Sequence, residues 1–351
     1  MKSRSDDKFK SRRSTIKDVA AEAQVSISTV SLVMNEKGNV SADTRDRVLS
    51  SARRLGYVPT QAARHLASKR TGNVGFVVRE DHFTRSEPFY TRVFLGTEFQ
   101  ARHDNLYVLL TTIPSHYVPG ENTPRFLREY NVDGLIVAGK VDGGFLEESR
   151  HLEIPMVLVD FEANGYPAIV IDNQNGAREA VDHLFDRGRL RIAFLGADTS
   201  HPSISARLDG YRLVHAARGL TPGSDLLVCA DEDPTRGTGK RLAERLLEIR
   251  PMPDAVFCAN DALALSVLEA AVHAGVRVGE DLAVIGFDDV PDAAHSRPPL
   301  TTVRVYKEQL GELAMRYIVD LIEEGSSKAA RFERGSQTIK VKTELIVRDS
   351  T

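Results

Sequence analysis

The sequence is poor in cysteine, lacks tryptophan and contains no long apolar run. Its only cysteines among 351 residues are Cys229 and Cys258, both in apolar, strand-like stretches. Two unpaired thiols in a reducing compartment are therefore expected, not a disulfide framework. No stretch approaches the roughly 18 apolar residues that a membrane-spanning helix requires. The N-terminus also lacks the apolar core of a secretory signal, so we expect a cytoplasmic protein with no membrane partner.

Charge is distributed unevenly along the chain, although the formal net charge is only −3. Residues 1–71 hold 15 Lys and Arg against 7 Asp and Glu, a net of +8. The other 280 residues hold 31 against 42, a net of −11. A basic head on an acidic body predicts a polyanion-binding module joined to a domain with a different role.

Short helices are expected in the basic head. Residues 1–13 are charged and aperiodic, which is typical of a disordered tail. Helices are predicted over 16–23, 27–34 and 42–55, with Thr15, Ser26 and Ser41 as N-caps and Gly56 ending the third. A further helix over 61–67 is too short to be stable alone. The resulting division is a tail at 1–13, a headpiece at 14–59, a hinge and linker at 60–71, and a body at 72–351.

The body alternates apolar, strand-like runs with helical stretches. The runs are 74–78, 107–110, 134–137, 156–160, 168–171, 192–195, 226–229, 255–258, 282–286 and 301–305. Helical patterns lie at 177–187, 206–218, 240–249 and 262–274. This alternation is typical of parallel sheets covered by helices on both faces. Ten strands exceed what one small sheet needs, so two α/β subdomains are expected side by side.

The first two predicted helices and the turn between them have the spacing of a helix-turn-helix. Val19, Ala20, Val30 and Val33 would form a small core between them. The second helix would present small polar residues near its N-terminus to the DNA major groove. A helical hairpin that packs only against another protein element would fit the same spacing.

Residues 15–35, TIKDVAAEAQVSISTVSLVMN, resemble the headpiece of the lactose repressor (LacI/GalR) family of bacterial transcription regulators. Further motifs of the same family are LGYVP at 55–59, RIAFLG at 191–196, AND at 259–261, DLAVIGFDD at 281–289, PPLTTV at 298–303 and ELIVR at 344–348. The resemblance covers nearly all of the chain after residue 13. It implies an all-α helix-turn-helix headpiece followed by an α/β effector domain like the periplasmic binding proteins, built from two doubly wound subdomains.

The resemblance places Ile27, Ser28 and Leu32 at the base-reading positions of the second helix. The lactose repressor has Arg at the last of these. Ile and Leu offer no hydrogen bond to a base edge but can contact a thymine methyl, so partial readout through thymine methyls is expected. The expected phosphate contacts are Thr15, Ser26, Thr29, Ser31 and Asn35, and Ser26 and Thr29 could equally serve as helix caps.

The hinge carries further expected DNA contacts. Leu66 matches the family's hinge leucine, which opens a base step in the minor groove; a surface linker leucine is the alternative. Ala63 is small enough to let two hinge helices approach, Arg64 attracts phosphate, and Tyr57 belongs to the same predicted DNA-binding set. Gln24 stands where the family often has Gly, and a non-Gly residue in a left-handed turn costs about 1 kcal/mol.

The body is expected to bind its effector at the carboxyl ends of strands. The candidate residues are Arg79, Phe89, Asp160, Arg207, Asn260 and Asp288. The resemblance puts Arg207 and Asp288 at effector positions and Phe89 at a stacking position, and an Arg with two carboxylates can bridge sugar hydroxyls. Alternatively, the Arg and an Asp form a pair that ties the two subdomains together. Phe83 and Tyr90 are expected only to pack the loop at 79–90.

Departures from the family pattern leave the effector open. The loop at 79–90 is longer and more charged than usual. Pro234 falls near the position of a sugar-stacking Trp in the lactose repressor. Val305 and Tyr306 replace a common Gln-Pro pair.

Two other classes of protein fit the sequence less well. RGTGKR at 236–241 suggests a phosphate loop, but Pro234 occupies the place of its first Gly and Arg241 that of its Ser or Thr. With no nucleophile elbow and no zinc-ligand spacing, neither an enzyme nor a cofactor nor a metal is expected. A free-standing sugar receptor would need export and no headpiece.

The sequence therefore predicts a homodimeric transcription regulator. Most members of the family are repressors, and the same role is expected here. It would bind a near-palindromic operator in double-stranded DNA and respond to a small molecule, expected to be a carbohydrate. The leucine repeat that makes the lactose repressor a tetramer is missing, so we expect a dimer.

Overall fold

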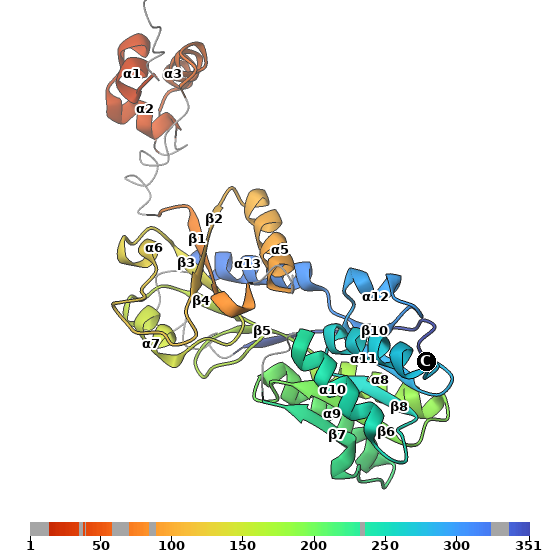
Figure 1. Ribbon diagram of the computed structural model, residues 1–351. Coiled ribbons are helices and arrows are strands. Elements are labelled where there is room, and N and C mark those ends of the chain that lie inside the picture. Colours follow the sequence, from red (N-terminus) through yellow and green to blue (C-terminus); the bar gives the residue numbers. More distant parts are fainter. Residues whose placement is uncertain are drawn as a thin grey trace, which may run out of the picture. The chain divides into compact units, whose positions relative to one another are not determined.

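The computed structural model describes residues 14–34, 38, 40–57, 70–83, 89–231, 236–323 and 337–351. The chain divides into a smaller unit, Met1–Asn73 with Asn131–Asp133, and a larger unit, Val74–Tyr130 with Gly134–Thr351. Figure 1 shows both units and labels their elements. No helix within the described ranges is long and apolar enough to span a bilayer.

The described residues of the smaller unit form three helices. Its helices are α1 (Ile16–Ala23), α2 (Ile27–Met34) and α3 (Ala42–Arg54). The predicted bounds of the first two are confirmed, and α3 ends one residue earlier than predicted, before Gly56 at φ +59°. Their apolar faces meet in a core that includes Val19, Val30 and Val48. The predicted helix at 61–67 and the tail at 1–13 lie outside the described residues.

The larger unit contains two six-stranded sheets (Figure 1). The first has the order β11-β5-β4-β3-β1-β2, with β1 (Asn73–Arg79), β2 (Tyr107–Ile113), β3 (Gly134–Ala138), β4 (Met156–Val159), β5 (Ala168–Ile171) and β11 (Thr338–Val341). The second has the order β12-β10-β9-β8-β6-β7, with β6 (Ile192–Ala197), β7 (Leu227–Ala230), β8 (Ala255–Cys258), β9 (Ala283–Asp288), β10 (Thr301–Arg304) and β12 (Glu344–Ile346). All ten predicted strands are confirmed, whereas β11 and β12 were not predicted.

Parallel pairing dominates both sheets, as predicted. In contrast, β12 pairs with β10 in the antiparallel direction, with Val303 opposite Leu345. The predicted helix-flanked sheets are present, and β2 is a partly exposed strand. This strand lies at the edge of the first sheet, and its Tyr107 is 60% exposed. The chain passes between the sheets after β5, after β10 and after β11, which makes two linked subdomains.

Helices flank each sheet. Those that accompany the first sheet are α5 (Phe89–His103), α6 (Arg125–Arg128), α7 (Gly143–His151) and α13 (Lys307–Glu323). Those that accompany the second are α8 (Asn173–Asp186), α9 (Pro202–Ala217), α10 (Arg236–Glu248), α11 (Asp261–Ala274) and α12 (Pro291–His295). Helices α5 and α13 pack so closely that a Cβ atom on Gly96 would lie 1.9 Å from the carbonyl oxygen of Glu308.

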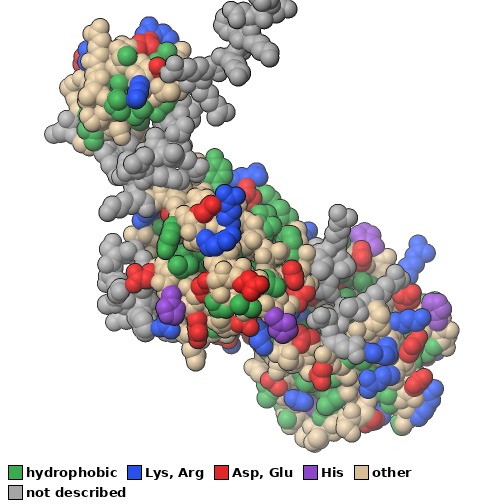
Figure 2. All heavy atoms as spheres, turned by 60° about the vertical axis from the view of Figure 1, so that its left-hand side comes forward, with side chains coloured by type: hydrophobic (Ala, Val, Ile, Leu, Met, Phe, Trp, Pro, Cys, Tyr) green, Lys and Arg blue, Asp and Glu red, His purple; other side chains and the backbone are tan. Residues whose placement is uncertain are grey.

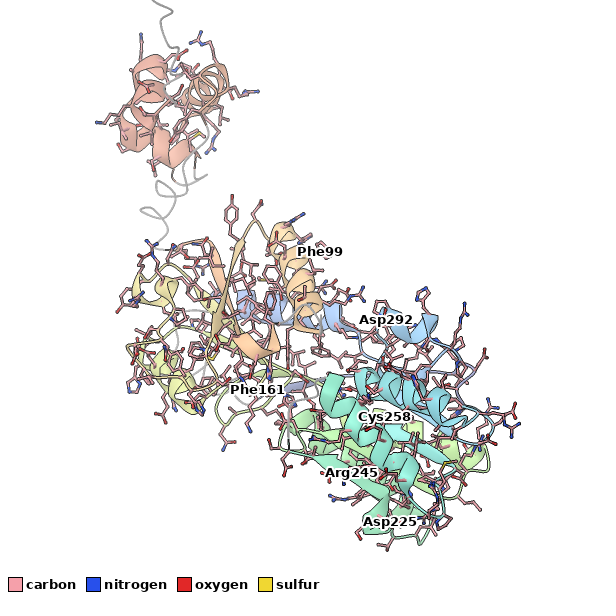
Figure 3. All side chains as sticks on the ribbon, in the orientation of Figure 1. Phe99, Phe161, Asp225, Arg245, Cys258 and Asp292 are labelled. Carbon is pink, nitrogen blue, oxygen red and sulfur yellow. The ribbon has the colours of Figure 1, made fainter. Side chains whose placement is uncertain are left out.

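Both cysteines carry free thiols, as predicted. Cys258 is fully buried at the end of β8, where Figure 3 labels it among the strands of the second sheet. Cys229 is only half-buried on the edge strand β7. The apparent phosphate loop at 236–241 forms the first turns of α10, so it is not a loop.

Candidate DNA-binding surface and effector site

The N-terminus of α2 carries a cluster of hydroxyl groups. The Ser26 Oγ accepts a hydrogen bond from the Thr29 backbone N–H at 3.0 Å, so Ser26 is an N-cap. The same oxygen lies 2.6 Å from Ser28 Oγ and 2.8 Å from Thr29 Oγ1. Hydroxyls at the positive end of a helix attract anions such as phosphate. The capping role foreseen for Ser26 therefore coexists with a surface suited to DNA.

Two apolar side chains of α2 face outward. Ile27 is 46% exposed and Leu32 is 42% exposed, whereas Val30 and Val33 of the same helix are buried. Figure 2 shows hydrophobic side chains beside Lys and Arg on the face of the smaller unit turned toward the viewer. Exposed apolar groups on a helix whose other face is already packed are available to an external partner.

The remaining DNA-binding candidates have varied surroundings. The backbone N–H and the hydroxyl of Thr15 both donate to the Asp18 carboxylate at 2.7 Å, as part of the N-terminal cap of α1. Ser31 is half-buried. Tyr57 is buried in the helical core, which leaves little of its side chain for a DNA contact. Asn35, Ala63, Arg64 and Leu66 lie outside the described residues.

In the turn between α1 and α2, Gln24 has a left-handed backbone conformation. This was expected because the family often has glycine at this position. Gln24 has φ 55° and ψ 47°, and its backbone N–H bonds the carbonyl oxygens of Ala20 and Ala21 at the end of α1. The turn therefore places a side chain where Gly would relieve steric strain.

An arginine cluster, formed by Asn173, Arg207 and Asp288, lies in the second subdomain. Arg207 on α9 is 4% exposed. Its Nε donates to Asn173 Oδ1 at 2.8 Å, its Nη1 donates to the Ala259 carbonyl at 2.6 Å, and its Nη2 lies 3.4 Å from Asp288 Oδ1. The guanidinium also lies 3.7 Å from the centroid of the Phe287 ring. All these residues belong to the second subdomain, so the alternative that this ion pair ties the two subdomains together is wrong.

A bridging cluster, formed by Tyr90, Asp160 and Ser203, does join the subdomains. Asp160 follows β4 in the first subdomain with φ 67°. Its carboxylate accepts the Tyr90 hydroxyl at 2.9 Å and the hydroxyl of Ser203, on α9 of the second subdomain, at 2.8 Å. Tyr90 is buried in α5, and burial raises the pKa of its phenol. Tyr90 was expected only to pack its loop; this is wrong, because the tyrosine holds a candidate carboxylate.

The turn after β9 is held from several sides. Asp288 and Asp289 have φ 112° and 51°, values at which non-glycine residues are strained. The Asp289 carboxylate accepts from Arg304 Nε and from Arg348 Nη2, both at 2.7 Å, and we call these three residues the Asp289 clamp. Burial opposes ionisation, yet the hydrogen bonds from the two arginines keep the pKa of Asp289 below its usual value. The turn is thus fixed in a shape that points Asp288 at Arg207.

Asp261 also holds the turn that follows β9, through hydrogen bonds. It is fully buried at the start of α11, accepts the Val290 N–H at 2.8 Å and accepts the Thr302 hydroxyl at 2.5 Å. Burial, together with the nearby Asp288 carboxylate, raises its pKa to about 8. Its Oδ1 would lie 2.1 Å from a Cβ atom on Gly286, so only glycine fits there without a shift.

The other effector candidates differ in position. Arg79 donates through Nε to Asp81 at 2.9 Å, within its own turn. Asn260 caps α11 by accepting the Leu263 N–H at 2.9 Å. Phe89 begins α5 and packs edge-to-face on Tyr90, with 5.0 Å between ring centroids. The structure thus brings Phe89, Asp160, Arg207 and Asp288 to the subdomain boundary and gives Asn260 a capping role.

Four residues at this boundary escaped sequence reasoning: Asn173, Ser203, Asp261 and Lys307. Ser203 and Asn173 lie at the starts of helices that follow a strand, the position where such sites are built. That signal could have identified them. Lys307 follows Val305 and Tyr306, the pair already noted as a departure from the family, and its ammonium donates to the Asp288 carbonyl oxygen.

Comparison with known proteins gives a consistent set of matches. Residues 15–60 match the family model described as bacterial regulatory proteins, lacI family, and residues 181–351 match a periplasmic binding protein-like domain. The chain is 33% identical over 353 residues to the HTH-type transcriptional regulator CelR of Thermobifida fusca, covering 97% of this chain and 98% of the relative.

Two solved structures extend the comparison. The complex of the transcriptional regulator CelR with cellobiose has a TM-score of 0.70 at 30% identity, covering 97% of this chain and 100% of that chain. The Lac repressor dimer bound to operator and the anti-inducer ONPF has a TM-score of 0.78 at 24% identity, covering 97% and 99%. At this lower identity the likeness establishes the fold.

Proposed function

The chain belongs to the lacI family of bacterial regulatory proteins, and from this premise we propose that it is a repressor controlled by a sugar or sugar derivative. As a family member it is a transcription regulator with a helix-turn-helix DNA-binding domain, and the relatives named above are regulators, not enzymes. The observation that carries the proposal is the placement of the arginine cluster beside the bridging cluster at the subdomain boundary.

The two clusters have the chemistry of a carbohydrate site. Carboxylates accept hydrogen bonds from vicinal hydroxyls, a guanidinium donates to them, and Phe89 supplies apolar surface for the ring. The structure of the CelR relative as a cellobiose complex supports this ligand class. A ligand bound to Asp160 on one subdomain and to Asp288 on the other would favour one mutual arrangement of the two. Its effect on DNA binding equals its differential affinity for the two arrangements.

For DNA binding we assign Ile27, Ser28 and Leu32 to the base edges, and Thr15, Ser26, Thr29, Ser31 and Asn35 to phosphates. The exposure of Ile27 and Leu32 supports readout of thymine methyls in the major groove. We assign Ala63, Arg64 and Leu66 to the hinge in the minor groove, and Tyr57 to support of the headpiece. The regulator would act on chromosomal DNA in the cytoplasm.

We further propose a homodimer that matches a near-palindromic operator. On the surface of the larger unit, α5 exposes Leu95 and Phe99, and the neighbouring edge strand β2 exposes Tyr107 and Leu110. Figure 3 shows Phe99 on α5 in the first subdomain. An apolar surface that continues from a helix onto a sheet edge suits burial against a second copy. Sedimentation at micromolar concentration should give the mass of a dimer; a monomer or a tetramer would contradict this.

The function is tested by binding to the DNA upstream of the protein's own gene, measured by fluorescence anisotropy at several salt concentrations. Specific binding should weaken steeply with salt, because phosphate contacts release counterions. A sugar panel that includes cellobiose is then titrated into the complex, and at least one compound should change the affinity. If no DNA fragment is bound specifically, the proposed function is wrong.

Readout through thymine methyls has its own test. Half-sites in which uracil replaces thymine lack only the methyl group. Loss of one buried methyl should cost about 0.8 kcal/mol, or roughly fourfold in affinity. The combined Ile27→Ala and Leu32→Ala variant should bind the thymine and uracil operators equally. Unchanged affinity of the unsubstituted protein for uracil operators would show that the two side chains do not read methyls.

A further inference from the structure

A buried cation without a carboxylate partner lies at the boundary between the two subdomains. Lys307, the first residue of α13, is only 4% exposed. Its ammonium donates to the backbone carbonyl oxygen of Asp288 and lies 5.7 Å from the centroid of the Phe89 ring. Within the described ranges no carboxylate lies at ion-pair distance from it, because the Asp288 carboxylate is turned toward Arg207. The charge is thus held by one carbonyl and one aromatic ring.

Such a charge is costly to bury. An ammonium has three N–H donors, and burial without an anionic partner removes solvation that a single carbonyl does not replace. The position adds a further penalty, because the first turn of a 17-residue helix is the positive end of its dipole. Burial lowers the pKa of Lys307, and the carboxyl groups of Asp288 and Asp261 only partly oppose this. Lysine is therefore an unfavourable residue here in the absence of a ligand.

The carboxyl groups near Lys307 form no ion pair with it in the described part of the chain. Asp289 is already paired with two arginines in its clamp. The raised pKa of Asp261, about 8, keeps its carboxyl largely protonated at neutral pH. Arg92 on α5 adds a further positive charge nearby, and it pairs with Glu308 at 3.4 Å on the exposed side of the helices. Lys307 therefore has no ion-pair partner among the described residues, while the Asp160 carboxylate at the same boundary is bonded by two hydroxyl groups.

We propose that the effector carries an anionic group, a phosphate or a carboxylate, which binds to Lys307 at the N-terminus of α13. The inference rests on the proposed function, since it names the class of ligand for the same boundary. The carboxylates of Asp160 and Asp288 would accept the hydroxyls of the ligand, while Lys307 and the helix terminus receive its charge. This makes Lys307 the residue that selects a sugar phosphate or a sugar acid over a neutral sugar.

A different role for Lys307 would be purely structural. Its hydrogen bond to the Asp288 carbonyl links α13 to the strained turn, and that link alone could maintain the shape of the site. The two roles differ in what they predict. A structural link affects the binding of charged and neutral ligands alike, whereas an anion-binding residue affects only the charged ones.

The experiment measures binding to the full-length protein by calorimetry, with matched pairs of probes. The pairs are glucose with glucose 6-phosphate, glucose with gluconate, and ribose with ribose 5-phosphate, and inorganic phosphate is the minimal anion. At least one anionic member should bind ten or more times as tightly as its neutral parent. Comparison of the phosphorylated sugars with gluconate then shows whether the site prefers a phosphate or a carboxylate.

The variant Lys307→Gln removes the charge but keeps a donor for the Asp288 carbonyl. It should reduce the affinity for the preferred anion to that of the neutral parent and leave the thermal midpoint without ligand unchanged or higher. The matched control Arg92→Gln removes an exposed cation from the same region and should keep the preference. If Lys307→Gln does not fold, the comparison of anionic and neutral probes on the unsubstituted protein still shows whether the site prefers an anion.

Three results would overturn the inference: no anionic probe binds, the neutral member of every pair binds as tightly as the anionic one, or Lys307→Gln keeps the anion preference. A neutral sugar that alone alters operator binding would contradict the inference and leave the proposed repressor function intact. Failure of all DNA fragments to bind would reject the repressor, while the anion preference at Lys307 would still be measured directly.

Discussion

The two units of this protein present their candidate binding residues in opposite ways. In the smaller unit, Ile27 and Leu32 stand exposed on α2 and take no part in its core. In the larger unit, Arg207 is buried and bound to an amide, a carbonyl and a carboxylate at once. The candidate base contacts Ile27 and Leu32 therefore take no part in the core, whereas the candidate effector residue Arg207 also stabilises the fold.

This difference has a general consequence for substitutions. A change on the exposed face of α2 should alter DNA affinity while leaving stability nearly unchanged. A change in the arginine cluster leaves buried polar groups without partners, so it should lower stability and ligand affinity together. The expected effects on the free energy of unfolding therefore fall from the larger unit to the smaller one.

The largest loss of stability is expected for Arg207→Gln. It removes a buried cation and leaves the Asp288 carboxylate and the Ala259 carbonyl without their donor, which should cost about 3 kcal/mol. Urea unfolding followed by circular dichroism would measure this. Arg212→Gln on the same helix, at an exposed position, serves as the control. An equal effect of the two would remove the distinction between buried and exposed sites.

A smaller loss is expected for Gly286→Ala. Its Cβ would lie 2.1 Å from Asp261 Oδ1, so the carboxylate or the strand must move, at a cost of about 2 kcal/mol. The same urea experiment applies, with Gly143→Ala as the control because nothing lies within 4 Å of its added Cβ. If Gly286→Ala leaves the free energy of unfolding unchanged, the Asp261 side chain can move without cost.

A pH-dependent effect is expected for Asp261→Asn. The pKa of this carboxyl is about 8 in the folded protein and near 3.8 in an unfolded chain, so the folded state keeps a proton that the unfolded state releases. Its contribution to stability is complete at pH below the unfolded value and declines as the pH rises to about 8.

Because Asn resembles the protonated acid, the variant should gain stability relative to the unsubstituted protein between about pH 5 and about pH 8. Urea unfolding across that range measures the difference. Asp209→Asn, an exposed change on α9, serves as the matched control. A difference that stays flat with pH would contradict the raised pKa of Asp261.

A gain of about 1 kcal/mol is expected for Gln24→Gly in the smaller unit. Gly relieves the left-handed backbone at φ 55°, although its added freedom in the unfolded chain offsets part of the gain. Hydrogen exchange of the α1 and α2 amides in the full-length protein would measure local stability. Faster exchange in the variant would show that the side chain contributes more than the strain costs.

The smallest effect on stability is expected for Ile27→Ala, within about 0.5 kcal/mol. Its affinity for a thymine-containing operator should nevertheless fall severalfold, because an exposed apolar contact to the DNA is lost. Thermal unfolding and anisotropy on the same preparation would measure the two quantities. A clear loss of stability would place Ile27 in the core and weaken the comparison between the units.

Much of the fold was predictable because local patterns coincide with tertiary structure. The bounds of α1 and α2 followed from a capping residue and a short apolar period, and ten strands followed from apolar runs. The strands β11 and β12 escaped prediction because they are short and partly exposed, and their pairing partners lie far away in the chain. The antiparallel pairing of β12 likewise has no local cause.

The candidate effector site was predictable only in part. Arg207 and Asp288 were named from family positions and Asp160 from the end of a predicted strand, but the sequence left open whether the arginine joined the two subdomains. Tyr90 and Ser203 do so through Asp160, and that bridge depends on residues 70 and 43 positions away from it.

By itself the sequence determined the family, the helix-turn-helix, the alternation of strands and helices, and the residue types available for binding. These features depend on neighbours a few positions apart, where capping, periodicity and turn geometry act. Tertiary structure alone decided that Asp261 supports the Asp288 turn, that two arginines clamp Asp289, and that Lys307 is buried without an ion-pair carboxylate among the described residues. Such facts arise only when distant segments exclude water from the same charge, because solvation and pairing are properties of the assembled site.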